Sequence, residues 1–113
     1  MRSYTDLNQS RKLAEILPLE SADMSYRPYR KEGGIPDYET TLLPFRYASW
    51  IGIPCWSLTA LLGIIPNVSL NAFKDGNWNA MVEHDGKMIY ANKDNPIDAC
   101  YEVIIKLHEQ KLL

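Results

Sequence analysis

Apolar residues recur at helical spacing near the start of the chain and predict an N-terminal helix. Asp6 stands before this pattern and Gln9 follows three residues later, which is the spacing of a capping box. The apolar positions that gather toward one side are Leu7, Leu13, Ala14, Ile16 and Leu17. Pro18 disfavours helical backbone at the residue before it, so the helix is expected to end near Ile16 or Leu17.

Farther along, three runs alternate between apolar and polar positions and predict β-strands. They are VSLNAF at 68–73, WNAMVEH at 78–84 and KMIYAN at 87–92. Turn residues separate them: KDGN at 74–77 and Asp-Gly at 85–86, where glycine accepts a positive φ without strain. An antiparallel three-stranded meander is therefore expected.

The middle run has two chemically different faces, because successive side chains of a strand alternate. Trp78, Ala80 and Val82 share one side of the strand. The other side carries Asn79, Met81 and Glu83. The side with the tryptophan is expected to face the core.

Asn95 and Pro96 predict the start of a C-terminal helix. Asn95 is a favourable N-cap and Pro96 suits the first helical position. Asp98 adds negative charge at the positive end of the helix dipole. The positions that then recur at helical spacing are Ile97, Cys100, Tyr101, Ile104 and Leu107. A helix over 96–109, packed on the sheet, is expected.

The stretch Trp50–Pro66 is the most apolar part of the chain and raises the question of a membrane span. Pro54 interrupts it, and Ser57 is a suitable cap for the remainder, SLTALLGII, which is about 13 Å long at about 1.5 Å per residue. A span needs roughly 20 apolar residues across about 30 Å, so a short helix buried in the core is expected instead. The predicted centre of that core is Trp50, Trp56, Leu58, Leu61, Leu62 and Ile65.

Residues 25–47 show no regular pattern and are expected to form an irregular loop. Prolines and glycines occur in it at positions 28, 33, 34, 36 and 44. A loop of this length in a compact domain is usually functional or mobile. With the elements above, the chain is predicted to be a single globular α+β domain over residues 1–113.

The composition of the chain argues against several classes of function. The 113 residues are 46% hydrophobic and 23% charged, as in ordinary globular proteins, and a net charge of −2 gives no general attraction for nucleic acid or anionic membranes. The polar N-terminus lacks the apolar segment of a secretory signal, so a cytoplasmic protein without a membrane partner is expected. Because no Cys-x-x-Cys pair, phosphate loop or dinucleotide motif occurs, we expect no metal site and no cofactor.

Cys55 supports an enzymatic alternative. It precedes a predicted helix start, where the helix dipole can lower the pKa of a thiol. His84 ends a predicted strand, and Asn92 or Asp94 follows one strand later, which is the order of the catalytic groups in papain-like cysteine hydrolases. No glycine-rich segment precedes Cys55, and His84 adjoins a turn. A buried thiol and a surface histidine are therefore the favoured interpretation.

One segment, residues 26–31, gathers aromatic and basic side chains. Its members are Tyr26, Arg27, Tyr29, Arg30 and Lys31. Displayed on a loop, they form the predicted binding surface for a protein partner. A weaker alternative is nucleic-acid binding, with Arg27, Arg30 and Lys31 on phosphates. Acidic residues follow directly in the sequence and cancel much of that charge, so nucleic acid is disfavoured.

Four segments carry a resemblance to a family. They are SRKLAEILPLESADM, LPFRY, IPCWSLTALLGIIPN and NPIDACYEVIIKLHE, in this order. On these segments the chain resembles a family of small uncharacterised proteins of gut Bacteroides-type bacteria, their phages and integrated elements. That family brings no established activity, cofactor or catalytic residue, so the resemblance implies a cytoplasmic accessory protein of bacterial or phage origin. The expected function is non-enzymatic binding of another protein, and association between copies of this chain is left open.

Overall fold

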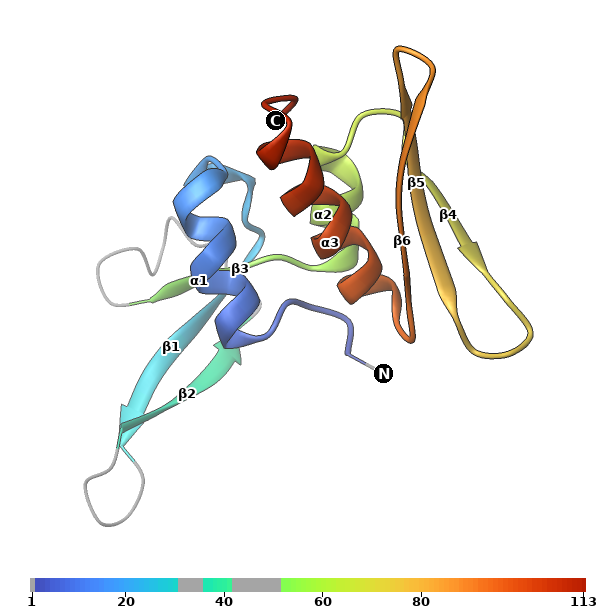
Figure 1. The fold of residues 1–113 in the computed structure, drawn as a ribbon. Coiled ribbons are helices and arrows are strands. Elements are labelled where there is room, and N and C mark those ends of the chain that lie inside the picture. Colours follow the sequence, from blue (N-terminus) through green and yellow to red (C-terminus); the bar gives the residue numbers. More distant parts are fainter. Residues whose placement is uncertain (1, 31–35, 42–51) are drawn as a thin grey trace. The chain divides into compact units, whose positions relative to one another are not determined.

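The structure, a computed structural model, describes residues 2–30, 36–41 and 52–113 (Figure 1). Contacts divide the chain into two compact units: Tyr4–Ala60, and Leu61–Leu113 together with the first three residues. The boundary falls inside helix α2. Helices and strands occur in both units, which confirms the predicted α+β class. That the whole chain is one domain stays a prediction.

The N-terminal unit begins with helix α1 (Leu7–Ile16), which starts and ends where the sequence pattern predicts. The capping box is formed: the Gln9 amide donates to the Asp6 carboxylate at 2.7 Å, and the Asp6 amide donates to the Gln9 side chain at 3.0 Å. A single 3-10 turn, η1 (Leu19–Ser21), follows the helix. Local sequence signals thus set both ends of α1.

A three-stranded sheet in the same unit overturns the expectation of an irregular loop over 25–47. Strand β1 (Met24–Arg30) pairs antiparallel with β2 (Pro36–Thr41) on one side and with β3 (Ile53–Cys55) on the other. The prolines suggested a loop, because a proline cannot donate a hydrogen bond to a neighbouring strand. On its β3 side, however, β1 is paired only from Met24 to Tyr26. Pro28 therefore lies where β1 has one described neighbour, and such edge positions tolerate proline. Residues 31–35 and 42–47 lie outside the described part.

The C-terminal unit contains the predicted meander, with strands β4 (Ser69–Ala72), β5 (Trp78–His84) and β6 (Lys87–Lys93) in this order. Helix α3 (Pro96–Glu109) packs on β5 and β6, beside which it lies in Figure 1. The buried sheet residues on the predicted core side are Ala80, Val82, Ile89 and Ala91. Asn95 caps α3 by accepting the Asp98 amide at 2.9 Å. Both predictions are confirmed.

The outer edge of β6 is covered by a side chain of α3. His84 and Lys87 flank the two-residue turn, so their backbones form a hydrogen-bonded pair. From there, hydrogen-bonded and non-hydrogen-bonded pairs alternate along the two strands. Tyr90 falls in a non-hydrogen-bonded pair, so its carbonyl points away from β5. Lys106 reaches around the edge and donates to this carbonyl at 2.7 Å. Its ammonium also lies 5.7 Å from the centre of the Tyr90 ring, a cation–π distance.

Helix α2 (Leu58–Ile64) confirms the short central helix but is less deeply buried than predicted. The Ser57 hydroxyl accepts the Ala60 amide at 3.2 Å and so caps the helix. Leu61 and Ile65 are buried, whereas Leu58 and Leu62 are half-buried. Trp56, just before the helix, is fully buried, and Trp50 lies outside the described residues. No helix in the described part of the chain is long and apolar enough to cross a membrane.

Candidate functional site

Cys55 lies in a setting that suppresses thiolate formation. It ends strand β3 rather than starting a helix, and its side chain is fully buried. The sulfur lies 3.5 Å from the Thr5 carbonyl oxygen and 3.6 Å from the Thr5 hydroxyl. Burial raises the pKa of the Cys55 thiol, although hydrogen bonds from Thr5 and Ser10 oppose the shift. A cysteine nucleophile needs the opposite shift, so this geometry gives the hydrolase alternative no support.

The other two proposed catalytic residues are not brought together. His84 ends β5, whereas Asn92 of β6 pairs with Asn79, which lies five positions before His84 on β5. At about 3.4 Å per residue this separation is about 17 Å. Asn92 instead accepts the Asn79 side-chain amide at 2.8 Å, and His84 lies 3.3 Å from the Asp85 carboxylate. Asp94, the other proposed orienting residue, precedes the cap of α3 and is exposed.

Both thiols are therefore expected to resist alkylation in the folded protein. Burial raises the pKa of Cys100 to about 11, and Cys55 shifts in the same direction. At pH 7 iodoacetamide should modify both slowly without denaturant and quickly in concentrated urea, because burial both limits access and suppresses the reactive thiolate. Peptide mass spectrometry would assign the label to each cysteine. Fast native labelling of Cys55, with Cys100 as the internal control, would contradict this and restore the hydrolase alternative.

The predicted binding segment 26–31 is only partly available as a surface. Tyr26 is 8% exposed, its hydroxyl donates to the Thr5 carbonyl at 2.7 Å, and its ring meets Tyr4 edge-on at 6.3 Å. It is a core residue, so its assignment to a binding surface is corrected. Arg27 is exposed on β1. Tyr29 and Arg30 end the same strand, and Lys31 lies outside the described residues.

A more distinctive surface lies on the side of the meander opposite α3, which we call the outer face. It carries Asn79, Met81 and Glu83 from β5, and Met88, Tyr90 and Asn92 from β6. The register sets Met81 opposite Tyr90 and Glu83 opposite Met88. Met88 is 47% exposed and Tyr90 51% exposed, although both are large apolar side chains. The outer face therefore has an apolar centre where a solvated sheet would ordinarily carry polar residues.

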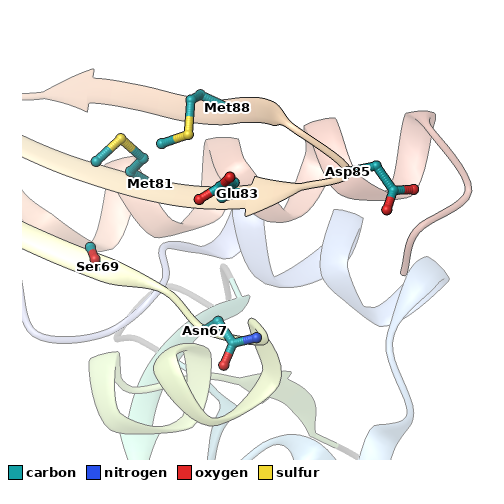
Figure 2. Close-up of a pocket in the computed structure, with 6 residues that line it drawn as sticks. All are labelled: Asn67, Ser69, Met81, Glu83, Asp85 and Met88. Atoms are coloured by element: carbon teal, nitrogen blue, oxygen red, sulfur yellow. The ribbon is translucent and has the colours of Figure 1, made fainter.

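An open pocket of about 550 Å³ lies beside this apolar centre. Its lining residues are Asn67, Ser69, Met81, Glu83, Asp85 and Met88. Figure 2 shows the side chains of Met81 and Met88 beside each other, with Glu83 next along β5 and Asp85 at the turn. In the described part of the chain, the lining contains two carboxylates and no basic residue. Within the described residues, Glu83 has no hydrogen-bond or ion-pair partner.

Comparisons of the chain with protein-family models, curated proteins and solved structures found no match. Among the residues that the structure describes, no group of three or more His, Cys, Asp and Glu side chains could hold a metal ion. Among the described residues, the outer face of the meander differs from an ordinary solvated sheet by its exposed Met88 and Tyr90.

Half of the outer face follows from the alternation of residues along β5, although this pattern alone does not mark it as a site. The alternation predicts that Asn79, Met81 and Glu83 lie together on the side away from the core. The missing half follows from the two-residue turn at 85–86, which fixes the register and so brings Met88 and Tyr90 next to them. A register worked out from that turn was the signal that could have revealed the site.

Proposed function

We propose that this protein is a small non-enzymatic interaction protein that binds another protein through the outer face. The observation that carries the proposal is the gathering of Met81, Met88 and Tyr90 on a sheet face that stays exposed, while α3 fills the opposite face. Methionine adapts its shape to different partners, and tyrosine is enriched among the residues that dominate binding energy at interfaces. An exposed apolar cluster with polar residues around it is typical of protein-binding surfaces.

The accessory role, the cytoplasmic location and the bacterial or phage origin belong to the same proposal. Their support is the resemblance over four segments. Nucleic acid is a less favourable partner for the outer face, because its pocket carries two carboxylates that would repel phosphates. A protein partner is the class whose chemistry this surface fits best.

Affinity capture with paired variants tests the proposal. The double variant Met88→Thr/Tyr90→Thr removes the apolar centre while keeping residues that favour strands. Leu19→Thr is the matched control, since Leu19 is 45% exposed but lies in η1 of the N-terminal unit, away from the meander in the sequence and outside its strands. Both baits should be folded, as judged by circular dichroism, and be compared with the wild-type chain in a bacterial lysate.

Capture alone does not decide the matter; the difference between the baits does. A protein held by the wild-type and Leu19→Thr chains should bind the double variant at least about 10-fold more weakly once it is purified, because two central contacts are lost. If every captured protein binds the double variant as tightly as the wild type, the outer face is not the binding surface.

A further inference from the structure

The outer face changes in chemistry along the strands. At the turn end it has the carboxylates of Glu83 and Asp85, and at the other end the hydrogen-bonded amides of Asn79 and Asn92. Met81, Met88 and Tyr90 lie between these ends. Along the strands, an occupant of the apolar centre therefore has a negative group at one end of its site and neutral polar groups at the other, while the Lys106 ammonium lies beside Tyr90 at the β6 edge. The position of the negative groups therefore indicates which charge a partner should carry at the turn end.

We propose that the bound segment is basic, with a lysine or arginine side chain at Glu83 and Asp85 and apolar side chains on the methionine–tyrosine centre. This inference rests on the proposed function and specifies its partner. Glu83 stands directly opposite Met88, so a segment that covers Met88 also removes water from the Glu83 carboxylate. Covering a carboxylate without a counter-charge is costly, whereas pairing it with a cation offsets the loss of water.

The chain supplies no such cation from the neighbouring described elements. Lys106 is occupied at the Tyr90 carbonyl, at the edge of β6. Lys87 lines a different pocket on the helix-facing side, with Ile89 and Leu112; Asp85 also lines that pocket, but Glu83 does not. The carboxylate of Asp85 has His84 as its neighbour, at 3.3 Å, while Glu83 has no described partner. The counter-charge for Glu83 therefore has to come from the bound segment.

The same arrangement selects against acidic segments. A negative side chain at the turn end would face two carboxylates, and like charges brought together at an interface weaken binding. Successive residues on one side of β5 are about 7 Å apart, so the cation and the nearest apolar contact are separated by about that distance. A basic residue two positions from an apolar one in an extended segment, or one helical turn away in a helix, meets this spacing.

Selection from a library of random 12-residue peptides displayed on phage tests the inference with the intact chain as bait. Three baits are compared: the wild type, Glu83→Gln/Asp85→Asn, and Met88→Thr/Tyr90→Thr. Peptides enriched on the wild type should combine lysine or arginine with large apolar residues. The Glu83→Gln/Asp85→Asn bait should enrich peptides without a preference for basic residues, because its pocket is neutral. The Met88→Thr/Tyr90→Thr bait should enrich no peptides.

The most enriched peptide is then synthesised and its affinity measured. Replacing Glu83 and Asp85 by their amides should weaken binding about 5–10-fold, and the wild-type affinity should fall as salt rises from about 50 to 500 mM. Enriched peptides without a basic excess, or affinities that the amide variants leave unchanged, would overturn the basic-partner inference alone. Equal enrichment on Met88→Thr/Tyr90→Thr, or none on the wild type, would contradict the proposed function as well.

Discussion

Replacing Trp56 by alanine is expected to lower the free energy of unfolding by about 3–5 kcal/mol. The side chain is fully buried, and its Nε1 donates to the Ser21 hydroxyl at 3.0 Å. Truncation leaves a cavity the size of an indole ring and removes one of the two hydrogen-bond partners of that hydroxyl, which still donates to the Pro18 carbonyl. A small domain is stable by only about 5–15 kcal/mol, so the loss is a large fraction of the total. Urea titration followed by circular dichroism measures it.

Trp78→Ala is the matched control for this substitution. Trp78 is half-buried at the start of β5, so the same truncation removes less buried area and should cost clearly less. The ordering of the two variants is therefore part of the expected result. A cost below about 1 kcal/mol for Trp56→Ala would mean that this tryptophan is not a core residue in solution.

Thr5→Val should cost about 2–3 kcal/mol although it preserves the shape of a fully buried side chain. The Thr5 hydroxyl accepts the Trp56 amide at 3.1 Å and shares a hydrogen bond of 2.8 Å with the Ser10 hydroxyl. Valine leaves the buried Trp56 N–H without its acceptor, and an unmade buried hydrogen bond costs about 1–3 kcal/mol. The free energy of unfolding in urea again gives the measurement.

Thr5→Ser separates the hydroxyl from the methyl group. Serine keeps the oxygen that Trp56 and Ser10 use and loses one methyl, which costs about 1 kcal/mol. Serine should therefore be the milder of the two substitutions even though it changes the side-chain volume more. A valine variant as stable as the wild type would show that these buried polar contacts contribute little.

The elements that the sequence predicts correctly are those whose signals lie within the element. Asp6 with Gln9 marks one helix start by hydrogen-bonding groups three residues apart. Asn95 marks the other by accepting the Asp98 amide, and Pro96 suits the first helical position. The Asp85-Gly86 turn has positive φ at both residues, 50° and 78°, as a two-residue hairpin requires. Local chemistry is sufficient for such features, because each partner lies within a few residues of the other.

The N-terminal sheet could not be predicted in the same way. Its central strand, β1, pairs with β3, and the paired residues Met24 and Cys55 are more than thirty positions apart in the chain. Prolines 28, 36 and 54 hide the alternation of strand residues. For the same reason Tyr26 could not be distinguished from an exposed tyrosine: only its place on β1, beside Met24 and Cys55 in a buried cluster, explains its burial.

The contact between Lys106 and Tyr90 makes the two edges of the meander unequal. At the β6 edge a carbonyl is already occupied and a positive charge stands beside it, which discourages the addition of another strand. At the other edge β4 has β5 as its only described neighbour. Two copies joined through β4 would form a six-stranded sheet with a lysine-guarded strand at each end. Such a pairing is isologous and self-terminating, so the asymmetry of the edges permits a closed dimer and opposes growth into a fibre.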